Sequence, residues 1–507
     1  MSTHPSAAAA LDVKQLGTFA AVASLGYVFW VCGAMEMVER LAWYGARQVS
    51  GLYATDAVSN GGLGLVESDL GLIFAAWAVT QTFVPVFTGG ISDRIGYKET
   101  IALSTVLKIV GYLLMATLPS FWGFLAGAVV VACGTGIFKP GLQGTIARSC
   151  SRENSSVAWG VFYQTVNIGG FIGPILAAHL RQLAWANVFY ACAAIIALNF
   201  LLLLCYTEPG KAERLARQQA LAASGMAEEP LWRASLRELR NPVLLWYIAL
   251  FCGFWFMLMI LWDVAPLYFR DWVDTSSLVS DVFGPEGTRS RALIFFFGLD
   301  NGGTHMLPEG LVNLNAMLIM TTCFLVAGLG ARLRAANAMA LGTFLASASL
   351  LVFGGFNAAW VIVAALAVFS VGEMLSSPKS SEYAANIAPE DCKAMYLGFS
   401  QLPIGVGWTL ESYLGPTLYG KYASRETISR VALGEHGLGP ADIAAIPNGE
   451  AFRRLVELSG QPAAALQAQL YAANDVGSLW YLMGSVGLIT AFGLWVYGRW
   501  TYRIVAH

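Results

Sequence analysis

Long apolar segments, separated by short polar ones, run along almost the whole chain. A helix needs roughly 20 mainly apolar residues to cross a bilayer, and by that measure the chain contains twelve membrane-spanning helices. They are predicted at 26–54, 67–91, 99–118, 122–149, 157–180, 185–207, 242–268, 308–332, 335–355, 357–386, 395–420 and 477–501. The pattern therefore predicts an all-α integral membrane protein.

A charged segment at 208–241 divides these predicted helices into two groups of six. Basic residues gather there and in the short loops on the same side, so the positive-inside rule predicts cytoplasmic termini and a multi-pass protein of a bacterial inner membrane. The other predicted divisions are an N-terminal tail at 1–25, an N-terminal bundle at 26–207, a C-terminal bundle at 242–501 with long external loops near 269–307 and 421–476, and a C-terminal tail at 502–507. The second of these loops could be a lid, a partner site or a solvated decoration, and we expect the last.

Composition agrees with a membrane protein and excludes several other classes. Hydrophobic residues make up 56% of the 507 residues and charged residues only 12%, about half the charged fraction of an ordinary soluble domain. The net charge of −2 gives no indication of nucleic-acid binding. Cysteines and histidines show no metal-ligand spacing and no paired acids are assembled, so we expect no metal, no cofactor and no enzyme activity.

Four charged residues lie inside the first predicted helix, where each is costly without water or a partner. Helical spacing places Glu36, Glu39 and Arg40 on one face and lets Glu36 pair with Arg40. Arg47 continues the same stripe. Spacing alone leaves two interpretations open, a salt bridge that only holds the helix in place and a charged functional site.

The segment GGISDRIGYK, between the second and third predicted helices, resembles the G-x-L-A-D-R-x-G-R-K signature of the major facilitator superfamily. The resemblance implies that superfamily's fold, with twelve helices in two six-helix bundles. Glycine allows the tight turn, and Asp93 can cap a helix or pair with an arginine across the half-barrel. Asp93 and Arg94 are therefore expected to take part in gating.

Five further segments resemble motifs of the proton-dependent oligopeptide transporter (POT/PTR) family, in the family's order. They are EMVERLAWYGAR in the first helix, GTGIFKPG in the fourth, FYQTVNIGGFIGP in the fifth, VNLNAML in the eighth and GEMLSSP in the tenth. We identify the chain as resembling a divergent member of that family. The resemblance implies proton coupling by Glu36, Glu39 and Arg40, and a peptide site formed by Arg40, Tyr44, Lys139, Tyr163, Asn167, Asn315 and Glu373.

Residue chemistry supports the same assignment. The fourth and tenth predicted helices are equivalent in the two halves, and one carries Lys139 while the other carries Glu373. A cavity between them would be positive on one side and negative on the other, which suits a zwitterion whose charges are well separated. Three structural alternatives stay open: Lys139 could snorkel, Glu373 could bond Ser370, and the asparagines could serve only as contacts between helices.

The seventh helix departs from the family pattern. The family's F-W-x-x-x-E-Q becomes FWFMLMILWD, in which Met259 replaces the glutamate. Asp263 lies one turn further along the same face. Our hypothesis is that Asp263 replaces the missing acid, pairs with Arg47 and forms an outer gate. The alternative is that Asp263 is an interfacial residue at the helix end.

Together these features predict a proton-coupled symporter that imports di- and tripeptides or similar zwitterionic amides by alternating access. Its expected partners are that substrate, protons and the lipid bilayer. Two alternatives remain, a transporter of a non-peptide substrate without proton coupling and a transporter-derived membrane sensor.

Overall fold

Twelve long helices dominate the computed structural model, which describes residues 18–151, 154–212, 216, 239–330, 333–387 and 399–505. In these ranges the regular structure is helical, apart from one isolated bridge between Leu299 and Met306. The long helices are α2 (Tyr27–Thr55), α3 (Glu67–Ile95), α4 (Tyr97–Thr117), α5 (Phe121–Ser149), α6 (Ser155–Arg181), α7 (Trp185–Leu204), α10 (Pro242–Asp263), α14 (Pro308–Gly330), α15 (Ala335–Gly355), α16 (Ala359–Ile387), α18 (Gln401–Tyr422) and α23 (Ser478–Val505). The predicted all-α, twelve-helix fold is confirmed.

One predicted boundary that the structure corrects is the end of the seventh long helix. The prediction ran to residue 268, but α10 ends at Asp263 and a separate short helix, α11 (Ala265–Trp272), follows. Pro266 lies in the first turn of α11. Proline has no backbone N–H to continue the preceding helix, whereas it fits well at a helix start.

Apolar composition alone identifies seven of the described helices as long and hydrophobic enough to cross a membrane. The first long helix, α2, is not among them, because it contains Glu36, Glu39, Arg40 and Arg47. All four of these side chains are buried. The helix therefore belongs to the interior of a bundle, where its charges meet partners and not lipid.

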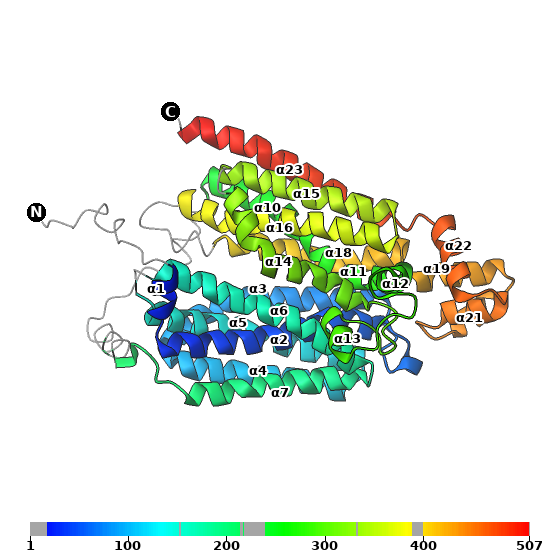
Figure 1. Cartoon of the computed structure of the whole chain (residues 1–507), viewed down its shortest axis with the longest axis horizontal. Helices are drawn as coiled ribbons and strands as arrows, with labels where there is room; N and C mark the ends of the chain where they lie inside the picture. Colours follow the sequence, from blue (N-terminus) through cyan, green and yellow to red (C-terminus); the bar gives the residue numbers. More distant parts are fainter. Residues whose placement is uncertain are drawn as a thin grey trace, which may run out of the picture.

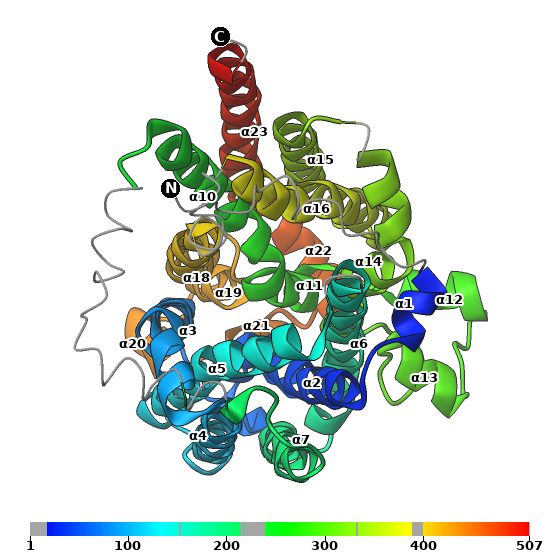
Figure 2. The same cartoon turned by 90° about the vertical axis from the view of Figure 1, so that its left-hand side faces the viewer.

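The twelve helices form two bundles of six (Figures 1 and 2). Helices α2 to α7 pack on one another, and α10, α14, α15, α16, α18 and α23 form the second group. The main contacts between the bundles join α3 to α18 and α6 to α14. Between the α3–α18 contact and the α6–α14 contact, helices of the two bundles face each other across the centre of the molecule.

Short helices gather at one end of the molecule, on the right of Figure 1, which we call the distal end. It contains α11, α12 (Ser276–Phe283), α13 (Arg291–Phe297), α19 (Arg425–Glu435), α20 (Pro440–Ala445), α21 (Ala451–Ser459) and α22 (Ala463–Ala473). The expectation that 421–476 is a solvated decoration is wrong for its inner face, because four leucines there are buried against the rest of the fold: Leu433, Leu455, Leu466 and Leu470.

The predicted tails and linker are described only in part. Within 1–25, α1 (Thr18–Ala23) forms a short helix, and α23 continues to Val505 past the predicted end at 501. Most of 208–241 lies outside the described residues, as do residues 1–17 and 506–507.

Small residues let α2 and α6 approach closely. A methyl group on Gly173 of α6 would collide with the backbone carbonyl oxygen of Leu41 and lie 3.0 Å from the amide nitrogen of Gly45. At Gly33, on the same interface, a methyl group would meet only the Thr165 Cγ2 atom at 3.6 Å, an ordinary contact.

The Gly173→Ala variant is therefore expected to lower the free energy of unfolding by about 1–3 kcal/mol, because overpacking forces the two backbones apart. Thermal unfolding in detergent measures the effect as a lower Tm. The matched variant Gly33→Ala should leave the Tm unchanged or slightly raised. Equal shifts for the two variants would contradict the close packing at Gly173.

Candidate functional site

The charge cluster of α2 begins with an ion pair along the helix. The Arg40 Nε atom donates to Glu36 Oε1 at 2.7 Å, and the two side chains are 7% and 4% exposed. This is the pairing that the spacing predicted. Two buried groups of opposite charge satisfy each other in this way, and either can be released when a second charged group arrives.

Glu39 points into the N-terminal bundle, where it forms an ion pair with Lys108 of α4. Both residues are fully buried, and Thr135 of α5 donates a hydrogen bond to the second Glu39 oxygen at 3.3 Å. The Lys108 ammonium also lies 4.0 Å from the centre of the Phe138 ring. Lys108 was not predicted as a site residue, although a lone lysine inside the apolar third span indicates a buried acid nearby.

Lys139 lies on α5 beside this cluster. It is half-buried, and its ammonium is close enough for its charge to interact with Arg40, Glu36 and Glu39. No hydrogen bond or ion pair joins that ammonium to another residue in the described part of the chain. Arg40 and Lys139 therefore form a positive pole, of which one member already has a carboxylate partner and the other is available to a ligand.

A negative pole lies on the C-terminal bundle. The Asn315 side-chain amide of α14 donates to Glu373 Oε2 of α16 at 3.1 Å and to Ser370 Oγ at 3.0 Å. The Asn315 carbonyl oxygen is buried and accepts no hydrogen bond from the described residues. Glu373 is thus held by Asn315, and the two side chains offer acceptor oxygens to a cationic group.

Tyr44 lies between the two poles. It is half-buried, and the charges of Arg40, Glu36 and Glu373 all act on its hydroxyl group. Its ring packs against Trp43 at 4.9 Å and against Trp262 of α10 at 5.6 Å, measured between ring centres. An aromatic floor of this kind contacts varied side chains with little discrimination, since each methylene changes binding by about 1–3 kcal/mol.

The remaining predicted site residues are less completely described. Asn167 is half-buried on α6 and interacts with another residue. The side chains of Tyr163, Asp93 and Arg94 lie outside the described residues, so the roles predicted for them stay predictions.

The predicted pair of Arg47 and Asp263 is present. The Arg47 Nη2 atom donates to Asp263 Oδ1 at 2.5 Å, and Ser412 of α18 donates to Asp263 Oδ2 at 2.7 Å. The guanidinium also stacks 3.5 Å from the centre of the Phe74 ring. Asp263 is the last residue of α10 but only 1% exposed, so the alternative of an interfacial residue is wrong. The pair joins the two bundles.

Three further polar contacts join the bundles at the distal end. Arg181 at the end of α6 binds Glu309 at the start of α14 through both carboxylate oxygens. The Arg270 Nη1 atom of α11 donates to Thr55 Oγ1 at 2.9 Å. Ser424, at the start of α19, donates to Glu67 at the start of α3. None of these three contacts was predicted from the sequence, although acids in first turns and an arginine in a last turn are the charges that helix dipoles favour.

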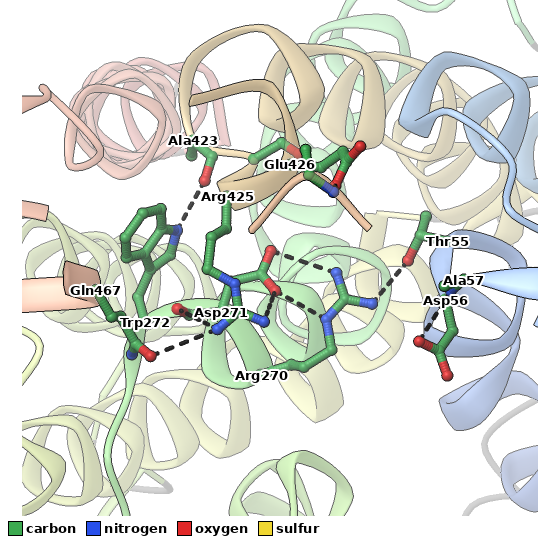
Figure 3. A network of polar contacts seen from close by, with 12 residues as sticks. Thr55, Asp56, Ala57, Arg270, Asp271, Trp272, Ala423, Arg425, Glu426 and Gln467 are labelled. Atoms are coloured by element: carbon green, nitrogen blue, oxygen red, sulfur yellow. Dashed lines mark hydrogen bonds and ion pairs between the residues drawn. The ribbon is translucent and has the colours of Figure 1, made fainter. Parts of the chain in front are cut away.

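Asp271 lies at the centre of a network of polar contacts at the distal end (Figure 3). Its carboxylate accepts from Arg270 Nε at 2.8 Å and from the Tyr419 hydroxyl at 2.7 Å, and it lies 3.4 Å from Arg425 Nη2. Arg425 also reaches Gln467 of α22. The network therefore ties α11 to α18, α19 and α22, and through Arg270 to the end of α2. The two bundles are held together at the distal end.

This network gives an expected dependence of stability on pH. Burial opposes ionisation of Asp271, but the Arg270 and Arg425 guanidinium groups prevail and lower its pKa. A carboxyl group whose pKa is lower in the folded protein stabilises it above the pKa of the unfolded chain, near pH 4 for aspartate, and this stabilisation is lost as the pH falls through the folded value.

The Asp271→Asn variant should therefore lower the free energy of unfolding by about 2 kcal/mol at neutral pH. The difference in Tm from the wild type should be constant down to about pH 5 and vanish in stronger acid. Glu286→Gln is the control, because its ion pair with Arg289 is about nine-tenths exposed. A difference that instead grows as the pH falls would contradict the assigned pairing.

The arrangement of these helices is similar to that of membrane proteins of known structure. In solved structures the arrangement occurs in a POT family transporter in complex with 5-aminolevulinic acid, with a TM-score of 0.65 and 15% identity over 95% of this chain and 99% of that one. It also occurs in a bacterial homologue of the human drug peptide transporters PepT1 and PepT2, with a TM-score of 0.63 and 19% identity over 94% and 99% of the two chains. The fold is that of a multi-pass membrane transporter.

The family model of the Major Facilitator Superfamily matches residues 52–411, and the chain belongs to that superfamily. Among curated proteins it is 28% identical over 140 residues to the quinolone resistance protein NorA of Staphylococcus aureus. That alignment spans 28% of this chain and 36% of NorA.

Proposed function

We propose that the protein is a proton-coupled symporter that imports di- and tripeptides or similar zwitterionic amides by alternating access. One observation carries the proposal: a positive pole of Arg40 and Lys139 faces a negative pole of Glu373 and Asn315, with Tyr44 in electrostatic contact with both. The poles belong to different bundles, so a ligand that binds both also links the two halves.

The chemistry of the poles selects the substrate class. A carboxylate suits Arg40 and Lys139, and an ammonium group suits Glu373 and the free Asn315 carbonyl oxygen. A peptide carries these groups at its two ends, whereas an α-amino acid carries them on one carbon atom. Two structural neighbours were solved in complex with 5-aminolevulinic acid and with a thioalcohol-conjugated peptide, ligands named for those proteins. Substrates of this kind are therefore the first to test.

Proton coupling belongs to the same proposal. Protonation of the Glu36 and Glu39 cluster, together with substrate binding, neutralises charges that otherwise hold the site in one state. At a membrane potential of 100 mV one inward proton contributes about 2.3 kcal/mol, enough for roughly fifty-fold accumulation of a neutral zwitterion. We assign the distal end to the outside of a bacterial inner membrane, because the basic loops and both termini belong to the opposite side.

A second candidate follows from the similarity to NorA. A drug exporter would bind quinolones or other drugs in place of peptides. The separate alternative of a membrane sensor would bind a ligand without moving it. The exporter therefore differs from a peptide symporter in its ligands, and the sensor differs in the absence of transport. The oppositely charged poles, in which Arg40 and Asn315 are buried, favour the zwitterion.

Ligand-induced stabilisation of the purified protein tests the substrate class. A compound that binds only the folded state raises stability by RT ln(1 + [L]/Kd), about 2.7 kcal/mol at a hundred times Kd. We expect di- and tripeptides to raise the Tm, and single amino acids and N-acetylated peptide amides to leave it unchanged. Stabilisation by quinolones without any effect of peptides would instead establish the exporter.

A further inference from the structure

A second buried acid lies beside the pair that joins the bundles. Glu411 of α18 is fully buried, and its carboxyl group interacts with that of Asp263. Neither Glu411 oxygen accepts a hydrogen bond from the described residues. The side chain fits because residue 415 is glycine, where any methyl group would collide with Glu411 Oε1.

The charges of this cluster do not balance. Among the described residues, the charged groups that act on Glu411 are Asp263 from α10 and Arg47 from α2. Arg47 donates to one Asp263 oxygen and Ser412 to the other, and the uncharged Phe74 and Trp77 rings of α3 lie over the guanidinium. Two carboxylates and one guanidinium would leave one unpaired negative charge in a site without water access, which is strongly unfavourable.

A single proton would remove the unpaired negative charge and give the Glu411 carboxyl group a hydrogen-bond partner. Two adjacent carboxylates are both acceptors, so a hydrogen bond between them requires a proton, and neighbouring carboxyl groups that share a site retain one. With that proton bound, one carboxyl group is neutral and the other pairs with Arg47, so the cluster has no net charge. The unpaired Glu411 oxygens then have a partner.

We infer that Asp263 and Glu411 form a proton-binding pair whose occupancy is required to close the distal end. When Arg47 is withdrawn, the pair takes up one proton from the distal solution, and closure brings the guanidinium of the N-terminal bundle onto the remaining carboxylate of the C-terminal bundle. Met259 occupies the position where the motif of the seventh helix has an acid, and Glu411 supplies a second carboxyl group from a different helix. The inference deepens the proposed symport and rests on it for its transport consequence.

Infrared spectroscopy of the purified full-length chain in lipid tests the proton site without any substrate. The C=O stretching band of a protonated carboxyl group is recorded from about pH 5 to about pH 9. We expect a band at neutral pH that disappears in Glu411→Gln and in Asp263→Asn, because the one acid that remains in each variant is balanced by Arg47 and needs no proton. The exposed acid Glu457 provides the control Glu457→Gln, which should leave the band unchanged. A spectrum that neither buried-acid variant alters would overturn the inference.

Transport in proteoliposomes tests the coupling. The wild type should accumulate peptide roughly fifty-fold at 100 mV, and Glu411→Gln should reduce accumulation to equal concentrations while exchange of labelled for unlabelled peptide continues. Full accumulation by Glu411→Gln would overturn the coupling role. If the infrared band behaves as expected but the wild type exchanges no peptide, the proton site is supported and the proposed function fails.

Discussion

Replacing Lys139 with alanine is expected to weaken peptide binding at least about thirty-fold. The Lys139 ammonium lies beside Arg40 and Glu36 and has no bonded partner among the described residues, so a substrate carboxylate is the group it would bind. Removing one partner of a desolvated charge pair typically costs about 2–5 kcal/mol. Peptide-induced stabilisation, titrated for the wild type and for Lys139→Ala, measures the change.

Lys108 provides the contrasting control. It is a buried lysine of the same bundle, but its ammonium already pairs with Glu39. Lys108→Ala should therefore lower the free energy of unfolding by about 3–5 kcal/mol, because it leaves Glu39 buried and unpaired. The Tm should fall strongly as a result. Lys139→Ala should keep its Tm and lose binding. If the effects of the two variants were exchanged, the positive pole would be wrongly placed.

Replacing Glu373 with glutamine should weaken binding of peptides with a free amino terminus by about tenfold to a hundredfold. The glutamine keeps the size of the side chain and its contact with Asn315 but removes the charge that an ammonium group needs. A hydrogen bond to a charged group contributes about 1.5–3 kcal/mol, which gives this range.

N-acetylated peptides make the test specific to the amino terminus. The wild type should bind a free peptide much more tightly than its acetylated form, and Glu373→Gln should bind the two about equally. The difference between the variants then reports the interaction of Glu373 with the ammonium group alone. Equal discrimination by both proteins would place the amino terminus elsewhere.

Much of this fold could be predicted from the sequence, because hydrophobic length decides where a chain crosses a membrane. The span predicted at 335–355 coincides with α15. The seventh helix was predicted too long because apolar residues continue past Asp263 into the first half of α11, where Pro266 marks the start of a new helix.

The site could be predicted where helical spacing or a family motif relates the residues, but not elsewhere. The pairing of Glu36 with Arg40 follows from helical spacing. The pairing of Arg47 with Asp263 follows from the family motif of the seventh helix, in which Asp263 lies one turn beyond the usual acid. Contacts between Glu39 and Lys108, or between Asp263 and Glu411, join residues that are 69 and more than a hundred positions apart. Only the packing of helices brings such residues together, and no local pattern encodes it.

Proton influx into proteoliposomes, driven by an inside-negative potential and started by adding a dipeptide, tests the central claim most directly. The account predicts internal acidification that depends on peptide and is abolished by Lys139→Ala and by Glu36→Gln. Peptides that bind and exchange across the membrane but move no protons would contradict it.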